Sequence, residues 1–477
     1  MSKQSNGINA VRVPWVMYPL NKAQQYSYED GNPDITVKFS QNANRLLRSN
    51  SVFLCGKMRL QARVGTGANQ TKQLPANRFD LQGSNGSTDL QNHEQVAYID
   101  HLTSVNGLMQ TVSVKDSTGS SLEEADRYHR QMASLIGVMN SYKNLCSYGN
   151  MSMSSCANND VMARELSSEV EFAIPMDGLG YLKSNSIIPL QRGFELVVRL
   201  ASDAKAIYGL SGNKFTFVLR DVYLMGDMLE TAQSQKGLKQ QYSSYKHHLN
   251  TLQSSNDYQN IPLNKAQVNR IFHNFSPSDW GSSFNYNSYA TCPILNKNAN
   301  KDDYVVANIE QYNVNRGAVA YPNQFRVSEK VINKVGGFQT VRSRMYLDGI
   351  SPYYKNTSCL ISPVTENLTR MVAARTDWLN TPQSPDSGLV RQWQKDANGN
   401  WTRDGPVESS AHVFGIAVNL DQLGVMQYSN YKVASYNYNI ESQLGVNAPQ
   451  NPTDVHVFVL ARTQLVTLKS GQTVAVS

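Results

Sequence analysis

Residues 169–180 read Glu-Val-Glu-Phe-Ala-Ile-Pro-Met-Asp-Gly-Leu-Gly and open the stretch Glu169–Leu229, which decides the fold because the chain repeats it. Val170, Phe172 and Ile174 alternate with glutamates at the start of this stretch. That period-2 pattern is typical of a strand with one buried face. An Asp-Gly turn follows the strand, so the stretch begins with a half-buried strand and a tight turn.

Two further strands are predicted in the same stretch. Phe194–Leu200 alternates apolar and polar residues, and Phe215–Leu224 closes the block. Three strands separated by turn residues are typical of an antiparallel β domain.

The same pattern returns 244 positions later. The matched pairs are Val170/Phe414, Phe172/Ile416, Ile174/Val418, Asp177/Asp421, Phe194/Tyr438 and Leu196/Ile440. Phe217–Leu219 returns as Phe458–Leu460, at an offset of 241. An even shift keeps each apolar side chain on the same face of its strand. Short strands resemble one another in any β-rich protein, but a register kept across three strands favours two β domains of one kind in tandem.

The length and composition agree with two domains. The chain has 477 residues, which is more than one hydrophobic core usually accommodates. Charged residues make up only 17%, which argues against a coiled coil or an acidic disordered protein. The net charge of +7 is spread along the sequence, so it indicates either ordinary surface residues or a polyanion nearby.

The cysteines indicate the compartment in which the chain is made. Their number is odd, and their spacing matches no metal site: Cys55, Cys146, Cys156, Cys292 and Cys359. We therefore expect reduced thiols and synthesis in a reducing, cytosol-like compartment. No signal peptide is recognised, and no apolar run approaches the length that spans a bilayer.

The predicted domain boundaries follow the pattern. Residues 1–27 form an N-terminal arm, 28–230 the first β domain and 241–477 the second. The polar stretch Asp227–Gln240 connects them, with 231–240 as the linker. The apolar patch within the arm is expected to dock on its own domain or on a neighbouring subunit, and contact with a membrane surface is the alternative.

Other elements are predicted inside each domain. Asp34–Ser40 and a long strand at 52–64 open the first domain, and Gln95–Asp116 again has strand character. Ser120 with Glu123 fits a capping box, which predicts an amphipathic helix to Met139. A counterpart helix is predicted from Ser362, with Pro363 at its first position.

Long polar loops are predicted at Gly65–His93, Gly281–Gly337 and Asn380–Ser410. Loops of this length on a rigid β scaffold are where partner contacts usually occur.

The sequence contains few patterns that are typical of a catalytic or binding site. No phosphate-binding loop, dinucleotide fingerprint, zinc motif or nucleophile elbow occurs. His247 and His248 are adjacent, so on a strand they would point to opposite faces, and we expect a surface loop pair and no metal site.

Two further groups of residues are candidate sites. Asp177 and Asp421 recur at equivalent turns, and an Asx-turn explains them more simply than twin cation sites. Trp378, Trp393 and Trp401 fit core or interface anchors better than a carbohydrate platform. We therefore expect no enzyme, no catalytic residues, no cofactor and no metal.

This pattern resembles the double jelly-roll major capsid proteins of tailless icosahedral DNA viruses. The closest likeness is to the proteins of polinton-like viruses and virophages, with adenovirus hexon and giant-virus capsid proteins more distant. It is carried by Thr111–Met139, a strand running into a Glu-rich helix, and by Val170–Leu190, a strand followed by an Asp-Gly turn. The likeness extends from about Asp34 to Val476 as architecture, without a short signature.

The resemblance implies an all-β fold of two tandem jelly rolls, each with an inserted helix and long surface loops. It implies a structural shell subunit of a virion, whose homotrimers form pseudo-hexameric capsomers. Its partners would be neighbouring capsomers, penton proteins and minor or cement proteins, with genomic DNA or an internal membrane nearby.

The alternative class is a binding module, either a minor, receptor-binding virion protein or a lectin-like β-sandwich protein. A penton protein should have a single jelly roll, which the repeat disfavours. A secreted lectin should show a signal peptide and paired cysteines, and this sequence shows neither pattern.

Overall fold

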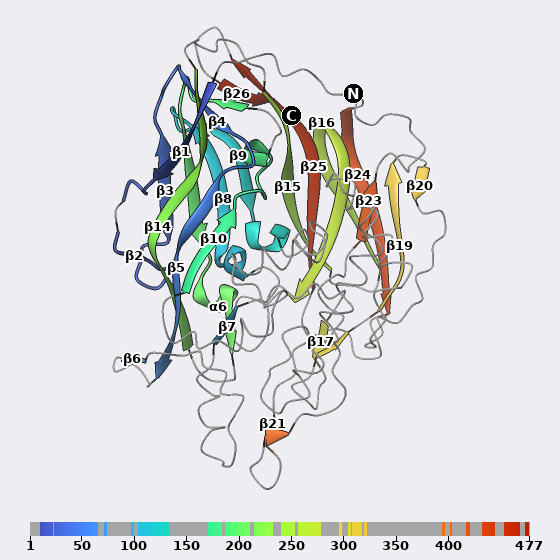
Figure 1. Ribbon diagram of the computed structural model, residues 1–477. Helices are drawn as coiled ribbons and strands as arrows, with labels where there is room; N and C mark the ends of the chain where they lie inside the picture. The colour runs from blue at the N-terminus through green and yellow to red at the C-terminus, as the bar shows by residue number, and fades with distance from the viewer. Residues whose placement is uncertain are drawn as a thin grey trace, which may run out of the picture.

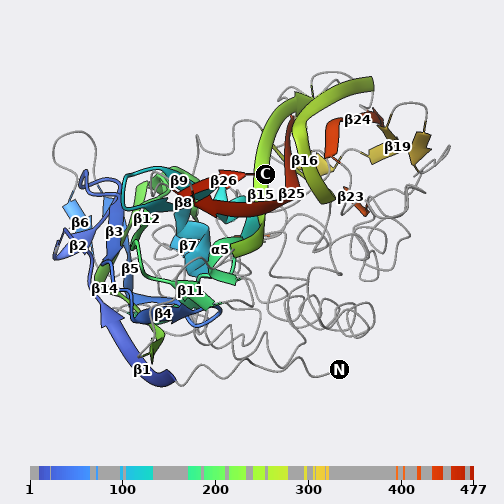
Figure 2. The ribbon, with the colours of Figure 1, turned by 90° about the horizontal axis from the view of Figure 1, so that it is seen from above.

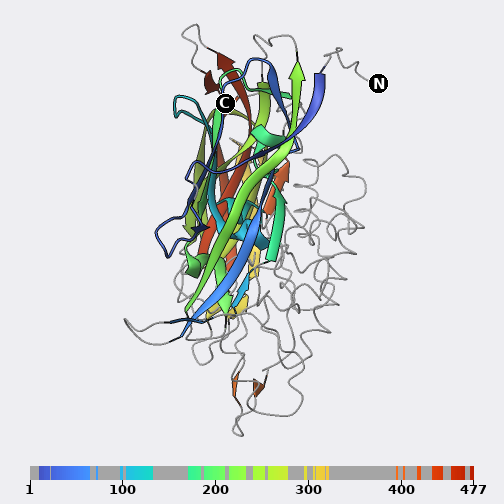
Figure 3. The same cartoon turned by 60° about the vertical axis from the view of Figure 1, so that its left-hand side comes forward.

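The computed structural model describes a large part of the chain. The described residues are 10–21, 23–64, 71–73, 97–99, 104–132, 170–183, 187–209, 214–231, 240–252, 256–277, 295–297, 304–306, 308–316, 319–321, 394–395, 401–402, 416–419, 432–443, 453–467 and 473–476. Strands dominate, and they stand nearly parallel to one long axis (Figures 1 and 3). We call the strands between residues 10 and 231 the first part, and those between 240 and 476 the second part.

The first part contains two sheets. The larger has the order β10-β5-β14-β4-β11, with β1 and β2 also paired to β14 and β6 to β5. These strands are β1 (Ala10–Met17), β2 (Gln25–Tyr26), β4 (Arg45–Arg48), β5 (Phe53–Val64), β6 (Thr71–Gln73), β10 (Val170–Pro175), β11 (Ile187–Pro189) and β14 (Lys214–Thr231). The smaller sheet has the order β3-β12-β8-β9. Its strands are β3 (Asp34–Phe39), β12 (Phe194–Leu200), β8 (Met109–Asp116) and β9 (Ser121–Asp126).

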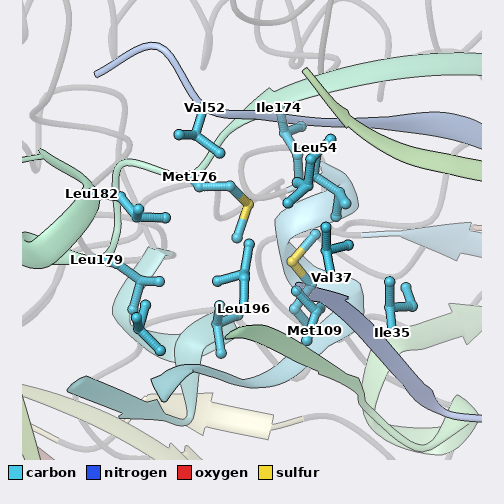
Figure 4. Packing of buried hydrophobic residues seen from close by; sticks show 14 of the residues in the cluster. Ile35, Val37, Val52, Leu54, Met109, Ile174, Met176, Leu179, Leu182 and Leu196 are labelled. Atoms are coloured by element: carbon cyan, nitrogen blue, oxygen red, sulfur yellow. The ribbon is translucent and has the colours of Figure 1, made fainter. Parts of the chain in front are cut away.

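One hydrophobic core lies between these two sheets (Figure 4). Leu54 and Ile174 come from the larger sheet, while Val37 and Leu196 come from the smaller one. All four are fully or almost fully buried. The sequence neighbours of Val37, Ile174 and Leu196 are more exposed, as period-2 alternation requires, while Leu54 has the buried neighbour Cys55. The predicted strands at 34–40, 52–64 and 194–200 and the one beginning at Val170 are therefore confirmed.

Short elements connect the sheets. The strands β7 (Ala97–Ile99) and β13 (Ile207–Gly209) pair with each other, next to the 3-10 helix η2 (Ser104–Leu108) and the short helix α6 (Asp203–Ala206). Helix α5 (Gly180–Lys183) follows the turn that begins after β10.

The second part is built around another large sheet, ordered β15-β25-β16-β24-β19-β20, with β23 paired to β16 and β26 to β25. Its strands are β15 (Gln240–Leu252), β16 (Asn256–Pro277), β19 (Asn308–Arg316), β20 (Val319–Tyr321), β23 (Ile416–Asn419), β24 (Lys432–Gln443), β25 (Thr453–Thr467) and β26 (Thr473–Val476). Two small ribbons accompany it, β17 (Leu295–Lys297) with β18 (Tyr304–Val306) and β21 (Gln394–Lys395) with β22 (Trp401–Thr402).

The strand pairings of the first part recur in the second. In the first part β14 pairs with β1 and β5, and β5 pairs with β10. In the second part β25 pairs with β15 and β16, and β16 pairs with β23. The chain order of these strands is also the same, so β15, β25 and β23 take the places of β1, β14 and β10.

The smaller sheet has its counterpart as well. The order β3-β12-β8-β9 corresponds to β16-β24-β19-β20, because the first half of the long strand β16 pairs with β24. Phe194 pairs with Phe39 and Asp116, and Tyr438 pairs with Gln259 and Val314. Phe194 and Tyr438, which are matched at an offset of 244, thus hold equivalent places in the two sheets.

The predicted helix from Ser120 is wrong over its first turns. Residues 121–126 form strand β9, paired with β8, and helical residues begin only at 128. The reason is a hairpin turn, in which Asp116 Oδ1 accepts hydrogen bonds from the backbone N–H groups of Thr118 and Ser120. Gly119, at φ +86°, completes this turn, and pairing with β8 then outweighs the capping pattern.

One other boundary also differs from expectation. Strand β14 continues to Thr231, so residues 227–231 belong to a sheet and not to the connection. The apolar patch of the predicted arm docks on its own domain, which was one of the two expected contacts: residues 10–17 form β1, paired along its whole length with β14. The predicted helix from Ser362, and most of the three predicted long loops, lie outside the described residues.

Candidate functional site

The two parts meet where strand β15 lies beside β9 and α5 (Figure 2). We call this contact the junction, and define it by Glu123, Asp126, Gly180, Tyr242 and His247 together with His456 on β25. The fully or almost fully buried polar side chains of Glu123 and His456 belong to it.

Glu123 anchors α5 to β9. Its two carboxylate oxygens accept hydrogen bonds from the backbone N–H groups of Gly180, at 2.9 Å, and Tyr181, at 2.6 Å. Burial raises the pKa of Glu123 to about 7, although both N–H donors favour the ionised form. The residue predicted to cap its own helix therefore fixes the start of another element, which lies against β15.

Tyr242, on β15, extends the hydrophobic core of the first part across the junction. Its hydroxyl donates to the carbonyl oxygen of Leu122 at 2.5 Å, and its ring packs edge-on against Tyr181, with centroids 5.5 Å apart. Tyr242 and Leu465, on β15 and β25, belong to the same buried cluster as the core of the first part. The two parts therefore share buried apolar surface.

Gly180 allows the backbones to approach closely. A Cβ added there would lie 1.8 Å from the carbonyl oxygen of Ser243 on β15. This is far inside van der Waals contact, so the first residue of α5 has to lack a side chain.

His247 and His456 form the second half of the junction. Nε2 of His247 lies 3.0 Å from Nδ1 of His456, so one ring donates a hydrogen bond and the other accepts it. Nδ1 of His247 lies 3.7 Å from a carboxylate oxygen of Asp126 on β9. This contact with His247 is the largest cause that lowers the pKa of Asp126.

His456 is held neutral by its surroundings. It is fully buried, and burial together with the positive charge of Arg130 lowers the pKa of His456 well below its usual value. His247, His129 and Arg127 act in the same direction. The neutral ring therefore suits this site, and a proton on it would place a new charge among cations.

The segment 127–132 contains Arg127 and Arg130, the positively charged residues that lower the pKa of His456. Arg127 adopts φ +59°, a left-handed conformation that ends β9 and turns the chain into the helical residues. His129 donates from Nδ1 to the carbonyl oxygen of Met109, and Gln131 donates to that of Gly178. Arg130 is fully buried in this segment.

The arrangement joins elements of the two parts. Among the described residues, no group of three or more His, Cys, Asp or Glu side chains is placed to hold a metal ion. Within the same residues, no helix is long and apolar enough to span a membrane. Two polar contacts cross the junction: the Tyr242 hydroxyl donates to the carbonyl oxygen of Leu122, and Nδ1 of His247 lies 3.7 Å from Asp126.

The structure places the candidate site residues His247, His248 and Asp177 in a strand and a turn. His247 and His248 lie in the middle of strand β15, so the expected surface loop is wrong. The reason is the long β15–β25 pairing, which extends the strand through both histidines. Asp177 lies in the turn before α5, with a carboxylate oxygen 3.9 Å from Nζ of Lys183.

The remaining candidates are only partly described. Trp401 belongs to β22, while Asp421, Trp378 and Trp393 lie outside the described residues. Cys55 is a buried free thiol, and burial raises its pKa. The other four cysteines lie outside the described residues.

Sequence reasoning missed the junction because its parts are far apart in the chain. Glu123 was interpreted as a cap, and His456 is a single polar residue inside the apolar run Val455–Ala461. The available signal was His456 itself, a histidine within a run that is buried throughout. A buried histidine needs a polar partner, which a distant strand can supply.

Comparisons with known proteins identify the fold. No protein-family model and no curated protein matches the chain. A chain from the cryo-EM structure of the Sputnik virophage is 10% identical, with a TM-score of 0.51 over 100% of this chain and 90% of that one. The Faustovirus major capsid protein is 8% identical, with a TM-score of 0.50 over 98% and 92% of the two chains. The mavirus major capsid protein is 10% identical over 100% and 93%, with a TM-score of 0.45.

The likeness to the first two structures extends over nearly the whole of both chains. At this level of identity it establishes the fold. The chain therefore has the mostly β fold of the Faustovirus major capsid protein and of the Sputnik virophage chain.

Proposed function

We propose that this protein is the major capsid protein of an icosahedral virus, a structural subunit of the shell. The observation that carries the proposal is the fold shared with the Faustovirus major capsid protein over 98% of this chain. A fold that matches from end to end leaves little of the chain for another activity.

The finer architecture in this proposal is a pair of tandem jelly rolls. It is supported by the recurrence of pairings, β1-β14-β5-β10 in the first part and β15-β25-β16-β23 in the second. The boundaries we propose for the domains are 28–230 and 241–477, with 231–240, from the last residue of β14 to the first of β15, as a linker. Residues 1–27 are the arm, whose segment Ala10–Met17 pairs with β14.

The proposed assembly is a homotrimer. Two similar domains per chain give six around a threefold axis, which suits a hexagonal lattice. Closed cyclic symmetry places the first part of one chain against the second part of the next. Neighbouring capsomers, penton proteins and cement proteins would be the partners in the virion, and no catalytic step is part of this function.

Light scattering on the purified protein tests the proposal. We expect three times the chain mass of 53.2 kDa, and negative-stain images with a hexagonal outline. A monomer that persists at high concentration would contradict the capsid function and favour a lectin-like or minor virion binding protein.

A further inference from the structure

His247 belongs to the second part of the chain, but its ring lies where the two parts meet. Its side chain is only 6% exposed. The ring stacks on that of His456, with centroids 5.3 Å apart, and lies tilted against that of Phe458, at 5.0 Å. Nδ1 of His247 faces Asp126 on β9, at 3.7 Å. One contact between the two parts therefore has a partner whose charge changes with pH.

The hydrogen bonds that His247 can make depend on its protonation state. A neutral imidazole has one N–H group, whereas an imidazolium has two. With a proton on each nitrogen, His247 can donate from Nε2 to Nδ1 of His456, at 3.0 Å, and present its second N–H group to the carboxylate of Asp126. The contact with Asp126 then becomes an ion pair, which is stronger than the contact of the carboxylate with a neutral ring.

The surroundings direct a proton to His247 and not to His456. The carboxylate of Asp126 faces His247 and favours the charged ring. Burial and the charge of Arg130 act against a proton on His456, whose pKa is well below its usual value. The pKa of Asp126 is also lowered, with the contact to His247 as the largest cause, so Asp126 stays ionised on mild acidification.

The other charged and titratable groups around the pair are basic, and they come from each neighbouring element. They are Arg127, His129 and Arg130 in the segment 127–132, Lys205 on α6, and Lys246 and His248 on β15. Their charges oppose a second proton on the pair. His247, which faces Asp126, is the ring with a partner that stabilises the charge.

We propose that Asp126, His247 and His456 form an acid-responsive latch between the two parts of the chain. At alkaline pH His247 is neutral and the latch is weak. On acidification His247 takes up a proton, and its ion pair with Asp126 fastens β15 to β9 while His456 accepts the second hydrogen bond. The latch counteracts the loss of stability that a neutral, buried His456 brings on acidification. It is a property of the single chain and does not depend on the capsid function.

A double-mutant cycle in the full chain tests the latch. Melting midpoints are measured for the wild type, Asp126→Asn, His247→Gln and the double variant, at pH 8.0 and pH 5.5, on either side of the usual titration of histidine. In the wild-type background, Asp126→Asn should lower the midpoint about twofold more at pH 5.5 than at pH 8.0. In the His247→Gln background the loss should be equal at both pH values. Glu123 and His456 are present in every member of the cycle, so their own titration cancels.

Glu124→Gln is the matched control. Glu124 is an exposed carboxylate two residues before Asp126, on the same face of β9, and its replacement should cost the same at both pH values. Salt supplies a second readout, because Asp126 is 52% exposed and its ion pair is screened. Sodium chloride at about 1 M should reduce the extra loss that Asp126→Asn shows at pH 5.5.

Two outcomes would overturn the latch. A loss on Asp126→Asn that is equal at both pH values would mean that the carboxylate does not respond to the charge of His247. A pH-dependent loss that persists in the His247→Gln background would assign the effect to another group. If His247→Gln does not fold, the comparison of Asp126→Asn with Glu124→Gln at both pH values and salt concentrations still decides. None of these results bears on the capsid function, which the mass measurement tests.

Discussion

Glu123 decides how one strand and one short helix are held together. Its carboxylate accepts hydrogen bonds from the backbone N–H groups of Gly180 and Tyr181, which lie at the start of α5 and do not pair strands. Glu123→Ala should lower the free energy of unfolding by about 2 kcal/mol or more, because buried donors lose their acceptor. Urea unfolding measures this, and Glu124→Ala, an exposed position on the same strand, is the matched control. Equal midpoints for the two variants would contradict the role of Glu123.

The buried histidines make stability depend on pH. The pKa of His456 is well below 6.5 in the folded chain, as is that of His129, so the folded state takes up protons less readily than the unfolded state. Their contribution to stability is present above pH 6.5 and is lost as the pH falls, by up to about 1.4 kcal/mol per pH unit for each ring.

Glu123 acts in the opposite sense. Its pKa is raised to about 7, so its protonated form stabilises the fold below pH 4.5, and that contribution is lost as the pH rises towards 7. Between pH 6.5 and 5.5, melting curves of His456→Gln should therefore depend less on pH than those of the wild type. Glu123→Gln should lose stability more steeply on acidification. Identical pH profiles for all three proteins would mean that neither group titrates in this range.

At the scale of elements, strand β10 shows that the alternation in the sequence has energetic consequences. Phe172 is 4% exposed and belongs to the core cluster. Phe172→Asp should cost several kcal/mol, about 3 or more, because a carboxylate would enter a packed core. Thermal denaturation measures the loss, with Glu171→Ala, an exposed neighbour, as control. An unchanged midpoint would show that this face of β10 is not buried.

Helix α5 and strand β15 depend on one missing side chain. Gly180→Ala places a methyl group 1.8 Å from the carbonyl oxygen of Ser243, so either α5 or β15 has to move. Backbone atoms cannot rotate away as a flexible side chain does, and we expect a fall in the melting midpoint of about 4 °C or more, equivalent to 1–2 kcal/mol. A midpoint within experimental error of the wild type would mean that the junction is loosely packed.

At the scale of the whole molecule, association should stabilise the fold. A subunit of a trimer gains stability from association by mass action, so its melting midpoint rises with protein concentration. A hundredfold dilution series should show this rise for the wild type. A wild type that is independent of concentration would argue against an obligate assembly.

The sequence by itself determined the strands and their repetition. Alternation at Val170–Ile174 and at 194–200 is a local property, since successive side chains of a strand point to opposite faces. The even offset of 244 preserved those faces, and the pairings of β12 and β24 agree with it. The resemblance to capsid proteins followed from the same pattern, and the fold comparison supports it.

Only the tertiary structure decided the segment from Ser120 to Asp126 and the junction. The local pattern around Glu123 fits a helix cap, yet an available edge on β8 and the turn at Asp116 make it a strand. His247 and His456 are 209 positions apart, and no local pattern records that β15 and β25 pair. Contacts of that separation depend on how whole sheets pack, because the hydrogen-bond partners of a buried polar group are supplied by distant strands.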